Sequence, residues 1–220
     1  MNDQLCLERS IKEDRIPPSD TKTRILDVAF RLFHEQGYHA TGIATILREA
    51  DVNSGSLYHF FPSKEALLIG VLEYATQIMH PVVMAPAEAA AEDGIERIFA
   101  LLANYRTGME MFQCKMGCPI GNLALEVADD HPPARALIDQ NFRNWAAVIE
   151  GWLRSVGDRL PPSADLGQLS RFILTVMEGG IMQARAAGNL VPFDESVAQL
   201  RAYFNLLQEQ ARAAREVGKQ

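Results

Sequence analysis

The segment from Asn53 to Phe61 brings together donor groups of a kind that bind phosphate oxygens. It reads Asn-Ser-Gly-Ser-Leu-Tyr-His-Phe-Phe, so its first turn carries only small side chains. Small side chains let the backbone come close to a partner, and the Ser and Tyr hydroxyls can donate hydrogen bonds to phosphate. The chemistry that this segment predicts is contact with a nucleic acid backbone.

A second chemical feature is the pair Cys114 and Cys118, which directly precedes a predicted helix at 119–128. The positive end of a helix dipole favours a thiolate, and Lys115 lies nearby in the sequence, so Cys118 is a candidate reactive thiol. The alternative is a small apolar residue buried at a helix junction. The total of three cysteines is odd, which predicts free thiols in a reducing compartment.

Other catalytic or metal-binding patterns are weak. The five histidines, at 34, 39, 59, 80 and 131, lack the spacing of metal ligands. Asp129-Asp130-His131 is better explained as a helix end and cap than as a site, and the sequence contains no zinc-protease, P-loop or nucleophile-elbow string. We therefore expect no metal, no cofactor and no catalytic residue.

Composition and charge bound the class of protein. The chain has 220 residues, of which 48% are hydrophobic, enough for a sizeable core. No run approaches the roughly 18 apolar residues of a membrane span, and the N-terminus lacks a signal-peptide pattern, so we expect a cytoplasmic protein. The net charge is −7, but residues 21–64 carry five basic and four acidic groups. This distribution allows nucleic acid binding by the N-terminal unit only.

The elements that would position the Asn53 to Phe61 segment are short helices. Residues 1–20 show no sustained period and are predicted to be a mobile arm. A helix with one apolar face follows from residue 21 and ends at Gly37, and Thr41 is a candidate N-cap for a second helix to Ala50. A third helix spans about 53–61. Three helices with a tight turn in about 40 residues describe a helix-turn-helix unit.

Longer helical segments make up the rest of the chain. Periodicity predicts helices at 64–79, 95–112, 119–128, 133–156, about 164–187 and about 195–215, with Pro81 and Pro86 ending the first and a connector at 85–93. No strand alternation persists. The predicted fold class is all-α with about nine helices: an N-terminal helix-turn-helix head and a C-terminal helical bundle.

The string from Thr21 to Leu68 resembles the DNA-binding domain of TetR-family transcriptional regulators. Gly37-Tyr38, Thr41, the segment Gly55-Ser56-Leu57-Tyr58 and the segment Phe61-Pro62-Ser63-Lys64-Glu65 all fall at the family spacing. The resemblance implies a DNA-binding domain at 21–68 and a ligand-binding and dimerisation domain at 69–220. It also implies DNA contacts from Thr41, Ser54, Gly55, Ser56, Tyr58, His59 and Lys64.

Simpler explanations exist for single members of this set. Thr41 could serve only as a cap, Tyr58 could be a core aromatic, and His59 and Lys64 could be ordinary exposed side chains. Position 54 is commonly Lys in this family and is Ser here, which removes a charge-assisted contact. We therefore expect DNA binding that is weaker or less salt-dependent than usual.

A single recognition helix reads few bases, so two copies on a twofold axis are required for specificity. Small residues in the 164–187 helix would let a helix of the partner chain approach. The alternative for each candidate residue is a place in the core of its own chain. The candidate interface residues are Phe172, Val176, Gly179, Gly180, Tyr203, Phe204 and Leu207.

The resemblance also implies a ligand pocket in the C-terminal bundle, although aromatic and Met residues at helical spacing are commonly plain core. The candidate lining residues are Tyr105, Met109, Phe112, Cys118, Asn122, Trp145, Trp152 and Met177. Their apolar bias indicates a small hydrophobic or aromatic effector.

The function predicted from the sequence is a homodimeric regulator, favoured as a repressor, that a small effector releases from a palindromic operator in double-stranded DNA. One alternative keeps this scaffold and makes Cys118 a covalent switch, because the Gly117-Cys118 step and the Leu123 to Asp129 run are similar to a TetR subgroup that senses electrophiles or oxidants. The other alternative is an all-α enzyme or scaffold whose N-terminal helices only mimic the motif.

Overall fold

The computed structural model describes residues 20–217, and within that range the chain is helical without a β-strand. This confirms the all-α fold class. The helices are α2 (Thr21–Gln36), α3 (Ile43–Ala50), α4 (Ser54–Phe60), α5 (Lys64–Met79), α6 (Ala85–Ala90), α7 (Gly94–Met111), α8 (Pro119–Val127), α9 (Pro132–Ser155), α10 (Leu166–Ala187) and α11 (Val191–Val217). The predicted mobile arm lies outside the described residues except for Asp20, whose side chain caps α2.

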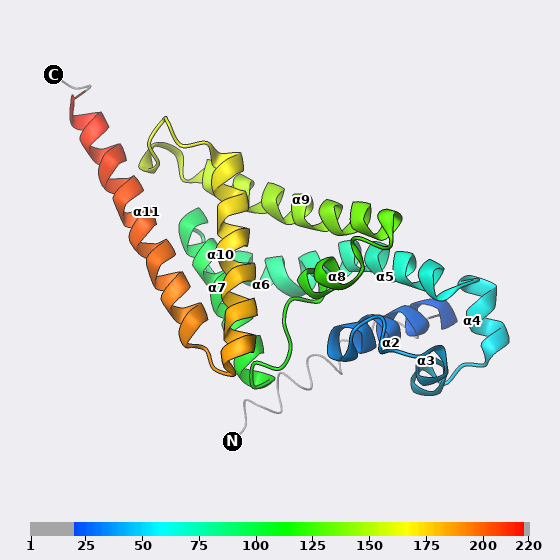
Figure 1. Ribbon diagram of the computed structural model, residues 1–220. Coiled ribbons are helices and arrows are strands. Elements are labelled where there is room, and N and C mark those ends of the chain that lie inside the picture. The colour runs from blue at the N-terminus through cyan, green and yellow to red at the C-terminus, as the bar shows by residue number, and fades with distance from the viewer. Residues whose placement is uncertain (1–19, 218–220) are drawn as a thin grey trace.

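The arrangement places a small head at one end of a longer body (Figure 1). The head consists of α2, α3 and α4. Helices α5 and α9 run alongside each other from the head toward α10, which packs against α11 at the far end. Helix α8 lies between the head and α9 and contacts both. The boundary predicted at residue 68 falls inside α5, which continues without a break from the head into the body.

The predicted helix at 64–79 is confirmed as α5, but the prediction that Pro81 and Pro86 end the helical path was wrong. A π-helical turn, His80–Met84, joins α5 to α6, and the Ala85 N–H donates to the His80 carbonyl. The wider π turn accommodates a proline that lacks the N–H of a regular ladder, and Pro86 lies in the first turn of α6, where the N–H is dispensable. Only residues 91–93 remain of the connector predicted at 85–93.

The continuous helical segment from Lys64 to Ala90 is long and apolar enough to cross a membrane by length and composition alone. In the fold its apolar side chains pack against the head on one side and α9 on the other. The buried residues of α5 are Leu67, Leu68, Val71, Leu72, Ala75 and Met79. Internal packing therefore accounts for the apolar residues of α5 that are buried.

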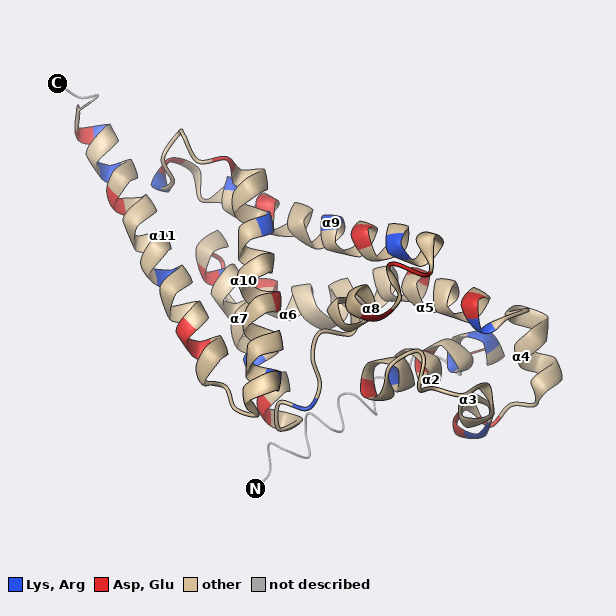
Figure 2. Ribbon diagram, viewed as in Figure 1, with Lys and Arg blue, Asp and Glu red and all other residues tan. Residues whose placement is uncertain are grey.

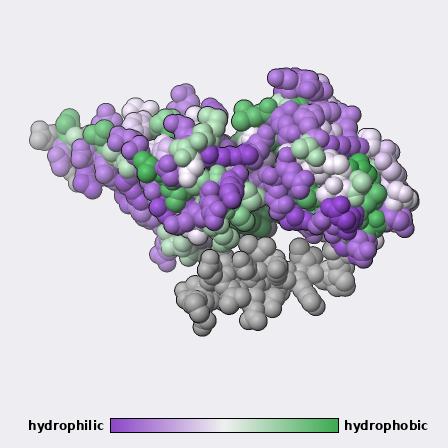
Figure 3. Space-filling view, turned by 60° about the horizontal axis from the view of Figure 1, so that its bottom comes forward, coloured by the Kyte–Doolittle hydropathy of each residue, from purple (hydrophilic) through white to green (hydrophobic). Residues whose placement is uncertain are grey.

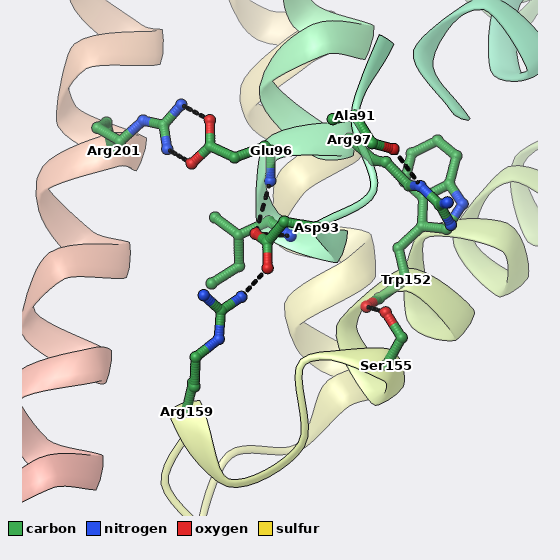
Figure 4. A network of polar contacts seen from close by, with 9 residues as sticks. Ala91, Asp93, Glu96, Arg97, Trp152, Ser155, Arg159 and Arg201 are labelled. Atoms are coloured by element: carbon green, nitrogen blue, oxygen red, sulfur yellow. Dashed lines mark hydrogen bonds and ion pairs between the residues drawn. The ribbon is translucent and has the colours of Figure 1, made fainter. Parts of the chain in front are cut away.

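A polar network fixes α7 relative to α11 and the end of α9 (Figure 4). Asp93 accepts from the backbone N–H groups that open α7 and also pairs with Arg159. The Arg201 guanidinium donates to both carboxylate oxygens of Glu96, at 2.5 and 3.0 Å, and lies 3.3 Å from the Phe99 ring centroid. Two-point geometry of this kind sets orientation as well as distance.

Gly94 lies at the closest approach of α7 to α9. A Cβ at this position would overlap the Trp152 carbonyl group, which is backbone and cannot rotate away. We predict that Gly94→Ala lowers the free energy of unfolding by about 2 kcal/mol or more. The measurement is chemical denaturation of the full chain.

Gly108→Ala is the matched control, because it is in the same helix and a Cβ there meets no atom within 4 Å. It is expected to gain about 0.5–1 kcal/mol from reduced backbone entropy of the unfolded chain. Equal stabilities of the two variants would contradict the close approach at Gly94.

Candidate DNA-binding head and effector cavity

Helix α4 presents a polar, exposed face at the tip of the head. Asn53 caps it by accepting from the Ser56 N–H at 2.8 Å, and Leu57 and Phe61 are buried against the rest of the head and α5. Ser54, Gly55 and His59 are exposed, and Ser56 is half-buried. Tyr58 is 49% exposed, so it is not a core aromatic and its hydroxyl is free to meet a phosphate. Helix α4 itself carries no Lys, Arg, Asp or Glu (Figure 2).

Thr41 is the one residue of the predicted DNA-binding set that is fully buried. The N-cap of α3 is Gly42, and Thr41 is fully buried, with its hydroxyl donating toward the Gly37 carbonyl at 2.6 Å and the Leu32 carbonyl at 3.3 Å. The prediction that Thr41 caps the second helix and touches phosphate was wrong. Its hydroxyl instead donates to the Gly37 carbonyl, just beyond the C-terminal end of α2, and at longer distance to the Leu32 carbonyl.

Lys64 begins α5 directly after the cap residue Ser63. Its Nζ lies 4.4 Å from the Tyr38 ring centroid and donates to the His39 carbonyl at 3.4 Å. Partial burial lowers the pKa of this amine. Without DNA, the lysine is therefore held against the turn between α2 and α3, beside α4.

A cavity of about 770 Å³ lies in the body between α8, α9 and α10. This is within the size range of small-molecule sites. Of the predicted ligand-binding residues, Cys118 and Asn122 line it, as does Gly179 from the predicted dimer set. The other lining residues are Gly117, Gly121, Ala124, Leu125, Asp139, Phe142, Arg143, Ala146, Ala147, Glu150, Ser170, Arg171, Leu174, Thr175, Glu178, Ile181, Met182 and Arg185.

The remaining predicted ligand residues do not line this cavity. Met109 and Met177 are core residues, and Phe112 is 43% exposed at the end of α7. Trp145 packs edge-on against Phe142. The Trp152 Nε1–H donates to Glu88 at 3.2 Å, which ties α9 to α6. These side chains complete helix packing, as apolar residues at helical spacing commonly do.

Three acidic groups meet at the inner end of the cavity. Burial raises the pKa of Glu178 to about 7, and burial together with Glu178 raises the pKa of the Cys118 thiol. Burial also raises the pKa of the Tyr105 hydroxyl, which lies against Cys118. The Sγ of Cys118 accepts from the Gly121 N–H at 3.4 Å as the cap of α8. The effect of burial and of the neighbouring carboxyl group on the Cys118 pKa therefore exceeds that of the helix dipole, and the thiol rather than the thiolate is favoured.

Helix α8 connects this cavity to the head. The Glu126 carboxylate accepts from the backbone N–H of Tyr38 at 2.9 Å and of His39 at 2.6 Å. At the other end, the His34 Nε2 lies 2.6 Å from the Gly117 carbonyl, and burial lowers the pKa of His34. The two ends of α8 and the loop before it are thus attached to α2 and to the turn that follows α2.

Two family descriptions match most of the chain. Residues 25–71 match "Bacterial regulatory proteins, tetR family", and residues 94–200 match "Tetracyclin repressor-like, C-terminal domain". The HTH-type transcriptional regulator YxaF of Bacillus subtilis is 34% identical over 164 residues, which cover 74% of this chain and 84% of YxaF. The chain belongs to the TetR family.

Other relatives extend the TetR-family comparison. The regulator LmrA of Bacillus subtilis is 31% identical over 79% of this chain and 90% of its own. The reduced form of NemR from Escherichia coli superposes with a TM-score of 0.72 at 25% identity, covering 83% of this chain and 96% of NemR. These relatives are transcriptional regulators, and the all-α enzyme or scaffold with a chance motif is not supported.

TetR-family membership implies dimerisation. Helices α10 and α11 carry exposed apolar side chains on one outer surface. Phe172 and Tyr203 pack edge-on against each other on the outside, 45% and 42% exposed, beside a shallow groove that Val176 and Gly179 also line. Figure 3 shows green apolar surface among purple polar surface along the arm at the left that carries α11.

Three predicted interface residues lie inside the chain rather than on this surface. Phe204 is 1% exposed and packs edge-on against Phe99, and Leu207 is 8% exposed. Gly180 is buried, and a Cβ there would press on the Phe193 ring at 3.0 Å. The expectation that these residues form an exposed seam was wrong, because they are buried in one chain, with Phe204 against Phe99 of α7 and Gly180 against Phe193 of α11. Gly179, in contrast, faces open space.

Glu178 and Glu126 were missed in the prediction. The signal available for Glu178 is a lone acid next to Met177 and between the apolar residues Leu174 and Ile181 of α10. For Glu126 the sequence holds no such signal, because its partners are backbone N–H groups 87 and 88 residues away.

The raised pKa of Glu178 predicts a pH dependence of stability. The native carboxyl keeps its proton up to about pH 7, whereas the unfolded one loses it near the ordinary glutamate pKa of 4.5. The native state therefore binds more protons in this window, and stability falls as pH rises through it, by about 3 kcal/mol in total. We predict that Glu178→Gln removes this fall between pH 5 and pH 8, measured by urea denaturation.

Glu150→Gln is the matched control, since Glu150 lines the same cavity but pairs with Arg154 at 2.5 Å. It should keep the pH dependence of the unsubstituted protein. The same slope in the Glu178→Gln protein would show that the carboxyl is solvated rather than buried.

Proposed function

We propose that this TetR-family chain is a cytoplasmic homodimeric repressor, released from a palindromic operator by a small, largely apolar effector bound in the α8–α9–α10 cavity. The observation that carries the proposal is the position of α8, which lines the cavity with one end and holds the head through Glu126 with the other. Repression is supported by relatives that include NemR and ComR of Escherichia coli, both named as transcriptional repressors.

DNA binding is assigned to the exposed face of α4 and the residues beside it. Ser54, Gly55 and His59 face the base edges or the adjacent backbone, while Ser56 and Tyr58 hold phosphates. Lys64 leaves the Tyr38 ring and pairs with a phosphate. Two heads in a dimer present two α4 helices to half-sites about one helical turn apart.

The effector acts by changing the distance between the two heads. A ligand can shift that equilibrium only if it binds one spacing more tightly than the other. Helix α8 is the element through which ligand binding could act on the head, because Gly121, Asn122 and Leu125 of α8 line the cavity, as do Gly117 and Cys118 just before it. A ligand that displaces α8 also displaces Glu126 and the turn it holds.

A covalent switch at Cys118 is the weaker alternative. Cys118 lines the cavity, but it is buried, and the raised pKa of its thiol disfavours the nucleophilic thiolate. Release of DNA by a thiol-alkylating reagent, lost in Cys118→Ser, would favour the covalent switch over reversible binding.

The direct test of DNA binding is fluorescence anisotropy with the DNA that flanks the protein's own gene, titrated with salt. We predict that Tyr58→Phe weakens binding about fivefold on specific and random DNA alike, because it removes one hydrogen bond to phosphate. Lys64→Ala is expected to lower the slope of log affinity against log salt by about one.

Ser163→Ala is the control for loss of a hydroxyl, because Ser163 is exposed in the turn before α10, away from the head. Its DNA affinity should equal that of the unsubstituted protein. Unchanged affinity in both Tyr58→Phe and Lys64→Ala would refute the contact assignment. If the flanking DNA binds no better than random DNA, selection from a random library identifies the operator for the same comparison.

The role of α8 can be tested without an effector. A Cβ at Gly121 would collide with the Glu178 carboxylate, so in Gly121→Ala either that side chain or the cavity end of α8 must move. We predict that Gly121→Ala weakens DNA binding about fivefold, and that it has little effect once Glu126→Gln has removed one of the two acceptors that hold the head.

Gly151→Ala provides the control, because a Cβ at this position of α9 meets no atom within 4 Å. Its DNA affinity should be that of the unsubstituted protein. Additive effects of Gly121→Ala and Glu126→Gln in this double-mutant cycle would mean that the two ends of α8 act independently.

A further inference from the structure

The inner end of the cavity contains an acid without a basic partner among the described residues. The Oε1 of Glu178 is buried and accepts no hydrogen bond, and its carboxyl contacts the Cys118 thiol. The Tyr105 hydroxyl, near Cys118 and Glu178, is also buried without a partner. Three groups that are neutral when protonated and anionic when not thus meet in one place.

The other charged residues of the cavity are used elsewhere or face solvent. Asp139 pairs with Arg143 at 2.8 Å, and Glu150 pairs with Arg154. Arg185 donates to the Asn122 Oδ1 at 3.1 Å, and Arg171 is exposed. Glu178 therefore differs from Asp139 and Glu150, the other acids of the lining, in having no ion pair.

An unpaired carboxylate is costly in a cavity whose surroundings are mainly apolar, so the empty site holds the proton instead. A ligand cation at the same place would replace that proton and stabilise the ionised form. Phe142, Ala146, Leu174 and Ile181 line the same cavity and would contact an apolar body.

We propose that the effector combines an aromatic or aliphatic body with a basic nitrogen, and that its protonated nitrogen binds the Glu178 carboxylate. This inference deepens the proposed function by assigning a chemical class to the ligand of that cavity. The protonated amine meets the neutral carboxyl group, the carboxyl proton leaves to solvent, and an ion pair remains. No covalent bond to the ligand forms or breaks.

Proton release makes the affinity depend on pH. Glu178 has a pKa of about 7, so the fraction that must lose a proton on binding falls as pH rises from 6 to 8. Affinity for a cation should rise about tenfold over that range. Cys118 and Tyr105 keep their protons because their pKa values are raised. His34 contacts the lining residue Gly117, and its pKa is lowered by burial.

The test uses three probes of the same shape: 1-naphthylmethylamine, its neutral analogue 1-naphthylmethanol and the anion 1-naphthoate. Isothermal titration calorimetry of the full chain at pH 6, 7 and 8 gives each affinity, and two buffers of different ionisation enthalpy give the protons released. We expect the amine to bind at least tenfold more tightly than the alcohol at pH 8, with proton release near pH 6.

Glu178→Gln should weaken amine binding about tenfold at pH 8 and remove its pH dependence, while affinity for the alcohol stays the same. Glu178→Asp, which keeps the acid, should retain the pH dependence. Glu150→Gln and His34→Gln should behave as the unsubstituted protein in the slope of affinity against pH. Denaturation profiles identify any variant that fails to fold, and the comparison of the three probes on the unsubstituted chain stands without variants.

Equal binding of amine and alcohol, tighter binding of naphthoate, or an unchanged pH slope in folded Glu178→Gln would overturn the assigned ligand class. Failure of the proposed function looks different. The amine would bind with proton release through Glu178, yet saturating amine would leave the affinity for operator DNA unchanged.

Discussion

One carboxylate holds the turn after α2 to the body. The turn after α2 exposes the backbone N–H groups of Tyr38 and His39, and Glu126 accepts from both. Gly37 makes this possible in two ways: its φ of 88° suits a residue without Cβ, and a Cβ there would lie 3.1 Å from the Glu126 oxygens. Charge-assisted hydrogen bonds to two adjacent amides fix direction as well as distance. The orientation of α4, which follows this turn, is thereby tied to α8.

The helices were predictable because each buries one apolar face, and a 3.6-residue period is visible without knowledge of the partner. The failures are places where the local rule is overruled by the neighbours. Pro81 was expected to end a helix, but a π turn carries the chain through it. Thr41 is a good cap residue by type, but its hydroxyl donates instead to the Leu32 and Gly37 carbonyls near the end of α2. Proline and threonine rules describe preferences of an isolated segment, and here packing sets the outcome.

The two candidate sites differ in how far the sequence predicts them. Helix α4 is a local feature: its cap, its buried Leu57 and its exposed Tyr58 all lie within nine residues. The cavity is not local, since it is the space that three helices leave unfilled. Aromatic type and helical spacing cannot separate Trp152, which fills a helix junction, from Phe142, which faces the space. The same limit applies to α11, where Phe204 points inward and Tyr203 points outward although they are adjacent in the sequence.

The carboxylates of Glu178 and Glu126 lie at opposite ends of the same short helix, α8. Glu178 lies against Gly121 in the first turn of α8, and Glu126 projects from its last turn. Nine residues of α-helix extend about 13 Å, which is too short to bend appreciably, so a displacement at one end reaches the other. A neutral ligand can fill the cavity and leave Glu178 protonated. A cation changes the charge of the group that packs on Gly121, and so adds an electrostatic change to the steric one at the point where α8 begins. In the proposed mechanism, Glu178 therefore responds to the charge of the ligand, and α8 transmits that response to the head.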